Sequence, residues 1–417
     1  MNRRDFLGLL TAGVAGGVLA KSAVAQGAAA NEIRIGMSAA FRGSAAGLGA
    51  ELYRGAQAYY SEINVRGGVF GRPISVVALD DSYNPEPCIR NTIQLLDREK
   101  VFFLSNYVGT PTLTRALPVI KQYADQNVVL VGNFTGAQPQ REAPYVDQVF
   151  NVRASYRQEM QALVERFWQA GARRFGVYYQ VDAYGRSGTD GVARALAARG
   201  ARIVAEATYV RNAIFDEDMG IAVTALREAG CDVVLCTGAY QGCAAFVRSA
   251  RDAGFAVPIS NVSFVGSDAM LALLAKHGRA KGRDYTRGLV NSQVVPSYDD
   301  TTLPGVAEYR ALMDKHNPPV PEAIRDANYA PQKYSFISLE GYVNARVITE
   351  ALRRAGATAG RPGFRQALES LRGLDLGIGA PLTFTPERHQ GLDSVYFTRV
   401  DGDHWVPIVD WSAAVKV

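Results

Sequence analysis

The sequence has little cysteine and little histidine, with four of each among 417 residues. The cysteines form no C-x-x-C pair, which excludes a disulfide-rich scaffold and gives no support to a zinc or redox motif. The histidines stand in separate segments, without the H-x-x-x-H spacing that places two imidazoles on one metal. We therefore expect no metal and no cofactor. Cys231, Cys236 and Cys243 suit either small buried side chains or, in an oxidising compartment, a disulfide.

A strong charge of one sign is also absent. Lys and Arg number 45 and Asp and Glu 40, so the formal net charge is +5, too small to predict a nucleic-acid-binding face. No apolar run of about 18 residues follows the N-terminal segment, which argues against a bundle of membrane-spanning helices. The G-x-x-x-x-G-K-[ST] phosphate loop and the G-x-S-x-G nucleophile elbow are missing. With no nucleophile–base pair visible, the sequence does not favour an enzyme.

The first 30 residues have the pattern of an export signal. Arg3 and Arg4 precede an apolar stretch over 6–20, too short for a spanning helix, and Ala23-Val24-Ala25 is a typical cleavage site. The arginine pair indicates the twin-arginine pathway, which carries folded proteins across a bacterial inner membrane. We predict a signal peptide over 1–25, cleavage near Ala25, and a soluble periplasmic product.

The rest of the chain alternates short apolar segments with longer amphipathic ones, a pattern typical of parallel strands covered by helices on both faces. In a first unit we predict strands at 33–39, 74–79, 101–104 and 128–131, and helices at 51–64, 85–98 and 111–124. The pattern restarts after 150, with strands at 175–179, 203–209, 233–236, 259–263 and 289–295 between helices that begin near 156, 184, 221, 242 and 268. Two such units indicate two Rossmann-like lobes.

The C-terminal part is less regular. Residues 297–330 are rich in proline and polar residues, which predicts a loop around one helix at 306–315. Helices at 335–355 and 362–371 follow, and short strands at 382–384, 394–399 and 405–408 end the chain. Asp80 and Asp81, at the end of the second strand, should point to opposite faces. We expect them to cap backbone groups of the neighbouring loop rather than to share a proton or a metal.

Ligands of open α/β sheets bind beyond the carboxyl ends of the strands, where loops and helix N-termini converge. Thr110 follows the third strand and is expected to be an N-cap, with Pro111 at the first helical position. The N–H groups of that turn, with the Thr110 and Thr112 hydroxyls, form a ready carboxylate site, although ordinary capping explains the same residues. Residues at the other strand ends complete a set that suits an amphiphilic small molecule: Ser44, Tyr107, Phe134, Thr135, Ala137, Asp182, Tyr184, Tyr240, Ser263 and Phe264.

A series of short motifs, taken in order over residues 32–411, resembles one known family. The motifs include Ile33-Arg34-Ile35-Gly36, Gly67-Gly68-Val69, Gly109-Thr110-Pro111-Thr112, Phe150-Asn151-Val152-Arg153-Ala154-Ser155-Tyr156, Asp182-Ala183-Tyr184-Gly185 and Leu339-Glu340-Gly341-Tyr342. In these the chain is similar to the type I periplasmic solute-binding proteins of the leucine/isoleucine/valine class, the receptors of ABC importers. The resemblance implies two α/β lobes, 31–152 plus 297–380 and 153–296 plus 381–417, joined by three hinge crossovers and closing on a ligand.

The resemblance also implies roles for single residues. Receptors of this class hold the ligand α-carboxylate with hydroxyls and helix N–H groups of the first lobe, matched here by Thr110 and Thr112 and then by Thr135 with Ala137. Tyr184 matches the tyrosine of the second lobe that covers the ligand. The acid that usually meets the ligand ammonium has no counterpart, because the matching loop over 263–266 holds none and the next acid, Asp268, also suits a helix start.

We therefore expect the periplasmic substrate-binding component of an ABC importer. Its ligand is an amino acid, branched-chain or similar, or a related small carboxylate, and its protein partners are the permease subunits. Phe134 and Phe264 are equally suited to enclose an aromatic or aliphatic acid, so the missing acid leaves the ligand class open. Two alternatives remain, a ligand-sensing receptor and a receptor for an amide, urea or aromatic acid. We expect a monomer.

Overall fold

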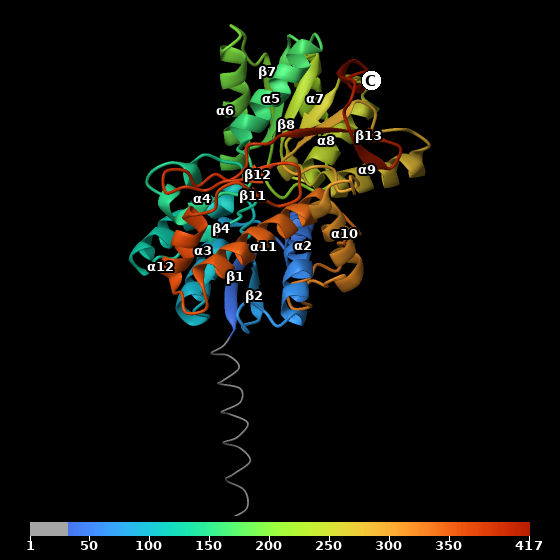
Figure 1. Ribbon diagram of the computed structural model, residues 1–417. Helices are drawn as coiled ribbons and strands as arrows, with labels where there is room; N and C mark the ends of the chain where they lie inside the picture. The colour runs from blue at the N-terminus through green and yellow to red at the C-terminus, as the bar shows by residue number, and fades with distance from the viewer. Residues whose placement is uncertain (1–31) are drawn as a thin grey trace, which may run out of the picture.

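The computed structural model describes residues 32–417, so the predicted export signal over 1–25 lies outside the described residues. Figure 1 shows two lobes, each built around a sheet with helices packed on its faces. The α/β class and the two-lobed arrangement predicted from the alternating pattern are therefore confirmed. Among residues 32–417, no helix combines the length and apolar character needed to cross a membrane.

The first sheet consists of five parallel strands in the order β2-β1-β3-β4-β5. They span Ile33–Ala39 (β1), Ile74–Asp80 (β2), Phe103–Ser105 (β3), Leu130–Val131 (β4) and Val149–Phe150 (β5). Successive residues belong to different buried clusters, Phe103 to one and Leu104 to the other, because side chains alternate between the two faces of a strand. Both faces are thus covered, by α2 (Ala46–Val65), α3 (Pro85–Ile93), α4 (Thr110–Gln122), α10 (Pro304–His316), α11 (Phe336–Ala355) and α12 (Arg361–Glu369).

The second sheet has seven strands in the order β14-β13-β10-β9-β8-β6-β7. They span Phe175–Gln180 (β6), Ala205–Tyr209 (β7), Val233–Thr237 (β8), Ile259–Asn261 (β9), Leu289–Gln293 (β10), Tyr396–Asp401 (β13) and His404–Pro407 (β14). The pairs from β7 to β10 are parallel, whereas β13 pairs antiparallel with β10 and β14. Its helices are α5 (Tyr156–Gln169), α6 (Ala183–Ala197), α7 (Gly220–Glu228), α8 (Tyr240–Asp252), α9 (Ser267–Lys281) and the short α13 (Trp411–Ala414).

The observed boundaries differ from the sequence pattern at several points. The structure adds β5, a two-residue strand that the pattern does not single out, and a small sheet of β11 (Leu374–Asp375) and β12 (Pro381–Leu382). The N-cap predicted at Thr110 is wrong, because α4 begins at Thr110 and its N-cap is Gly109. All four cysteines are buried and free.

Crossovers connect the two lobes. The first, from β5 to α5, runs beside the last, from β12 to β13, as an extended pair: Asn151 N–H donates to His389 O at 2.7 Å, and Leu392 N–H donates to Val152 O at 2.9 Å. The remaining crossover leads from β10 to α10. A capping box ends the first crossover, with Gln158 N–H donating to Ser155 Oγ at 3.3 Å and Ser155 N–H to Gln158 Oε1 at 2.8 Å. The turn that enters α5 is therefore fixed on the second lobe.

The proline-rich segment after α10 packs on α2 through a buried ion pair. Arg54 lies 3.0 Å from Glu51 and donates to Pro318 O at 3.1 Å and to Gln332 O at 2.6 Å. Gln332 N–H donates to Glu51 Oε1 at 2.9 Å. These bonds satisfy backbone groups that lie outside regular structure, so the predicted loop is an ordered strap on the first lobe.

Candidate functional site

The carboxyl ends of strands from both sheets meet between the lobes, and the helices and turns that follow them begin there. Thr110 begins α4 after β3, and Thr135 lies in the loop after β4. From the second lobe, Tyr156 begins α5, Tyr184 is the second residue of α6, and Phe264 lies in the turn after β9. Each of these five side chains is at most 1% exposed. The structure thus brings together residues more than 150 positions apart.

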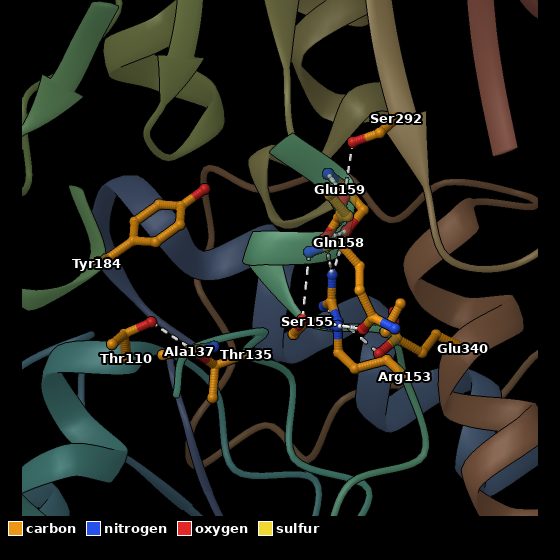
Figure 2. A network of polar contacts seen from close by, with 12 residues as sticks. Thr110, Thr135, Ala137, Arg153, Ser155, Gln158, Glu159, Tyr184, Ser292 and Glu340 are labelled. Atoms are coloured by element: carbon orange, nitrogen blue, oxygen red, sulfur yellow. Dashed lines mark hydrogen bonds and ion pairs between the residues drawn. The ribbon is translucent and has the colours of Figure 1, made fainter. Parts of the chain in front are cut away.

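Three of these residues, Thr110, Thr135 and Tyr156, form what we call the hydroxyl cluster. The Thr110 and Thr135 hydroxyl oxygens lie 2.7 Å apart, and Ala137 N–H donates to Thr135 Oγ1 at 3.3 Å (Figure 2). The Tyr156 hydroxyl is buried and has no hydrogen-bond partner in the described chain. Burial raises the pKa of Tyr156 to about 12, while the Arg153 charge and the nearby hydroxyls of Thr135 and Thr110 oppose that rise. This tyrosine hydroxyl is therefore neutral and able to donate.

The turn that begins α4 depends on Gly109. Its φ is +102°, and a Cβ added there would lie 2.3 Å from the Tyr83 ring, so only glycine fits this conformation and this contact. Because Gly109 occupies the N-cap, the Thr110 hydroxyl is free to meet Thr135. Thr112 differs: its hydroxyl donates to Val108 O at 2.5 Å and Gly109 O at 2.9 Å, back into its own turn. The Thr110 hydroxyl thus meets Thr135 within the hydroxyl cluster, whereas the Thr112 hydroxyl already donates to carbonyl oxygens of its own turn.

Aromatic rings from both lobes surround the hydroxyl cluster. Phe264 of the second lobe stacks on Phe134 of the first, with ring centroids 5.0 Å apart and an interplanar angle of 30°. Tyr184 lies 4.6 Å and Tyr83 6.0 Å from the Phe264 ring, and Tyr156 lies 5.2 Å from Tyr184. Such contacts stabilise the observed arrangement of the two lobes by dispersion and by removal of apolar surface from water. Sequence reasoning missed Tyr83 and Tyr156, although Tyr156 stands in a motif that it quoted.

A buried charge cluster of Arg153, Glu159 and Glu340 lies on the opposite side of Ser155 from Thr110 and Tyr184 in the view of Figure 2. Arg153 Nη2 lies 3.2 Å from Glu159 Oε1, and Nη1 lies 3.5 Å from Glu340 Oε1. The Arg153 guanidinium also lies 4.9 Å from the Phe134 ring centroid. Burial raises the pKa of Glu340 to about 7, against the Arg153 charge and together with the Glu159 charge.

Ser263 belongs to this charge cluster. It accepts from Arg153 and donates both its N–H, at 2.9 Å, and its hydroxyl, at 3.0 Å, to Glu159. Ser292 adds a further donor to Glu159 at 2.7 Å. The polar groups of Ser263 are therefore bonded within the protein and do not face the hydroxyl cluster.

The other predicted site residues are more dispersed. Tyr107 points into the first-lobe core near Cys88, where its hydroxyl lies 3.1 Å from that of Thr92. Ser44 is half-buried in the turn that precedes α2. Asp182 caps α6, and Tyr240 makes a contact between lobes, with Gly47 N–H donating to its hydroxyl at 3.4 Å.

The carboxylates near the strand ends also bond within the protein. Asp80 accepts from Phe41 N–H at 2.8 Å, and Asp81 accepts from the Ser38 hydroxyl at 2.8 Å and from Tyr83 N–H at 2.9 Å. The expectation that this pair caps backbone groups is confirmed. In residues 32–417, no group of three or more His, Cys, Asp or Glu side chains is arranged to hold a metal ion.

Asp268 is the first acid in the sequence after the loop where the resemblance places an ammonium-binding residue. It accepts from the Tyr298 hydroxyl at 2.8 Å and from Phe336 N–H at 3.0 Å. Burial raises its pKa to about 7, although both bonds oppose that shift. Asp268 therefore ties α9 to the start of α11, and both of its oxygens are in use.

Comparison with known proteins agrees with this architecture. A family model described as "Periplasmic binding protein" matches residues 32–404. A structure from Rhodopirellula baltica SH 1, described as a possible leucine/isoleucine/valine-binding protein, is 30% identical, covers 92% of this chain and 98% of its own, and has a TM-score of 0.79. A Leu/Ile/Val-binding protein homolog from Brucella suis biovar 1 is 26% identical over 78% of each chain.

A more distant structure shares the fold alone. It is a branched chain amino acid ABC transporter protein from Thermus thermophilus with bound valine, 18% identical, with a TM-score of 0.78 over 91% of this chain and 96% of its own. The family consists of solute-binding receptors rather than enzymes, and its name places it in the periplasm. The chain therefore belongs to the periplasmic binding proteins, in the type I class of the Leu/Ile/Val-binding proteins.

Proposed function

We propose that this protein is the substrate-binding component of an ABC importer and that it captures a small carboxylate, an amino acid or a related acid, between its lobes. One observation carries the proposal: the hydroxyl cluster is buried at the starts of two helices and takes Thr110 and Thr135 from the first lobe and Tyr156 from the second. Helix N-termini attract anions through free N–H groups and the helix dipole. Once the proton shared between Thr110 and Thr135 turns to the ligand, three hydroxyls donating to one carboxylate would form strong, charge-assisted bonds that link the lobes.

The aromatic rings would cover the rest of the ligand. Phe134 and Phe264 are in contact across the lobes, so a ligand enters only after the lobes move apart and then takes the place of part of that stack. The paired crossovers at Asn151 and Leu392 offer a place for such a movement, since they join the lobes without belonging to either main sheet. Lobe closure by hinge rotation is a common response to a ligand held between two domains.

Two further parts of the proposal concern the cell. We propose that the segment over 1–25 directs export through the twin-arginine pathway and that the loaded receptor delivers its ligand to permease subunits. The lobe boundaries proposed are 31–152 plus 297–380 and 153–296 plus 381–417. The Thermus protein with bound valine has the same fold, which supports an amino acid or a similar acid as ligand.

Ligand-dependent stabilisation and closure test the function together. A thermal-shift screen over amino acids, aliphatic and aromatic acids, amides and urea should reveal a carboxylate that raises the melting temperature, because ligand binds only the native state. Small-angle scattering with that ligand should give a smaller radius of gyration than without it. Amides that stabilise the protein as well as the matching acids would refute carboxylate capture, and an unchanged scattering profile at saturation would refute closure.

A further inference from the structure

The chemistry of the site also bears on whether its ligand carries a positive charge. This inference rests on the proposed capture of a carboxylate by the hydroxyl cluster. An amino acid would bring an ammonium group next to its carboxylate, and burying an ammonium without a negatively charged acceptor costs several kcal/mol. The protein would therefore need a carboxylate that is close to the hydroxyl cluster and still able to accept.

The acids nearest to the aromatic rings already accept hydrogen bonds from other groups of the protein. Glu159 accepts from Arg153, from the N–H and hydroxyl of Ser263, and from Ser292. Asp182 accepts from Tyr184 N–H at 2.9 Å and Gln180 Nε2 at 2.5 Å, and it lies 3.6 Å from Arg211. An ammonium at either carboxylate would have to displace a bond that the protein already makes.

Glu340 is the remaining candidate acceptor. Its contact with Arg153 is an ion pair at 3.5 Å, and the Arg153 guanidinium itself lies against the site, 4.9 Å from the Phe134 ring centroid and 5.8 Å from that of Tyr156. Burial also raises the pKa of Glu340 to about 7, so near neutral pH a large fraction of it is uncharged. A cation on the ligand would therefore meet the Arg153 guanidinium before it met Glu340, and two positive charges repel each other.

The surroundings of the hydroxyl cluster favour an uncharged ligand body instead. Phe134, Tyr184 and Phe264 are each at most 1% exposed and pack on one another at 4.6 to 5.0 Å. A ligand that separates Phe134 from Phe264 must offer both rings an apolar surface to recover the lost contacts. A flat ring or a branched alkyl group does so, whereas an ammonium offers no apolar surface, and the Arg153 guanidinium already lies over the Phe134 ring at 4.9 Å.

We infer that the ligand is a carboxylate with an aromatic or branched apolar body and no ammonium group, and that Tyr156 is a specificity-determining residue for it. The buried, unpartnered hydroxyl of Tyr156 donates to the ligand carboxylate from the second lobe, beside Thr110 and Thr135 from the first. Tyr156 thus makes carboxylate recognition depend on closure of both lobes. Glu340 does not bind the ligand, and the buried Arg153 guanidinium, 4.9 Å from the Phe134 ring and with Nε and Nη1 free of hydrogen-bond partners, keeps this side of the site positively charged.

Matched ligand pairs test the missing ammonium by calorimetric titration of the mature protein. Phenylalanine is compared with 3-phenylpropanoate and leucine with 4-methylpentanoate, and benzoate, phenylacetate and 3-methylbutanoate complete the acids. We expect at least one acid to bind, and each acid of a pair to bind more tightly than its amino acid by at least about tenfold. An amino acid that binds more tightly than its matched acid would overturn the inference but leave carboxylate capture intact. If none of the acids binds, the inference is also overturned. If amides bind as tightly as the matching acids, both this inference and the proposed carboxylate capture are refuted.

Variants test the role of Tyr156. Tyr156→Phe should weaken the binding acid by roughly tenfold or more, because a bond from a hydroxyl to a charged group is lost. Tyr60→Phe is the matched control, since Tyr60 is also buried with an unpartnered hydroxyl but lies in the first-lobe core. Equal affinities of wild type and Tyr156→Phe would contradict a direct bond. A loss of amino-acid binding in Glu340→Gln, with acid binding unchanged, would assign an ammonium to Glu340 and overturn the inference.

Discussion

Arg153 and Glu340 meet at 3.5 Å between the two lobes, with side chains only 1% and 4% exposed. Arg153 lies within the crossover that leads into α5, whereas Glu340 lies on α11 of the first lobe. The same guanidinium lies 3.2 Å from Glu159 of the second lobe, so one cation serves two carboxylates at the hinge. A buried charge is tolerated only while it keeps its partners, which makes this cluster sensitive to single substitutions.

Arg153→Met should destabilise the protein by about 3–5 kcal/mol, because it leaves Glu159 and Glu340 buried without their cation. Urea unfolding followed by circular dichroism measures the change. Arg194→Met is the matched control, since Arg194 pairs with Asp190 on the surface and should cost less than about 1 kcal/mol. Equal losses of unfolding free energy in the two variants would show that the buried charge cluster contributes no more to stability than a surface ion pair.

Stability should fall as pH rises from about 5 to about 8. Burial raises the pKa values of Asp81, Asp268 and Glu340 to about 7, from 3.8 for Asp and 4.5 for Glu. The folded protein therefore binds these protons more tightly than the unfolded chain, and the free energy of unfolding declines as pH rises between the unfolded and folded pKa values. His389 acts in the opposite sense, because burial lowers its pKa.

The Glu340→Gln variant isolates one part of this pH dependence. It removes a titrating group that faces Arg153, Glu159 and Arg141, so its melting temperature should change less between pH 5 and pH 8 than that of the wild type. The exposed Glu165→Gln variant on α5 should keep the wild-type slope. Identical slopes for wild type and Glu340→Gln would mean that Glu340 is already ionised at low pH.

The two threonines of the α4 turn should behave differently. Thr110→Ala removes a hydroxyl of the hydroxyl cluster and should weaken the bound carboxylate by about ten- to a hundredfold. Thr112→Ala removes bonds to Val108 O and Gly109 O and should lower stability by about 1 kcal/mol, with affinity within about twofold of wild type. Titration and thermal unfolding of both variants check this pattern. The reverse ranking of affinities would place the carboxylate at Thr112.

Export should depend on the arginine pair. Replacing Arg3 and Arg4 by Lys should leave the precursor in the cytoplasm, since the twin-arginine pathway recognises that pair. Cell fractionation with an immunoblot for precursor and mature forms measures the effect, and the wild-type signal is the control. Normal processing of the variant would assign export to another pathway.

The order of helices and strands could be predicted because each element buries one or both of its faces. Burial places apolar residues at the spacing of a helix or a strand, and that spacing is visible in the sequence. Strands such as β6 and β8 are short apolar runs, and the helices after them begin at capping or small residues, Asp182 before α6 and Ala239 before α8. β5 could not be predicted, because two residues carry no period and exist as a strand only through pairing with β4. The N-cap at Thr110 was assigned from propensity, but the close approach of Tyr83 selects Gly109 instead.

The sequence by itself determined the family, the two-lobed α/β class and the segments that follow the strands, because local pattern and ordered motifs carry that information. Only the tertiary structure decided which side chains of those segments meet. In the folded protein the Thr112 hydroxyl donates within its own turn, Ser263 bonds to Glu159, and the Tyr107 side chain lies in the first-lobe core. It also placed Tyr156 opposite Thr110 and Thr135, since the direction of a side chain follows from the packing of distant helices and not from its neighbours in sequence.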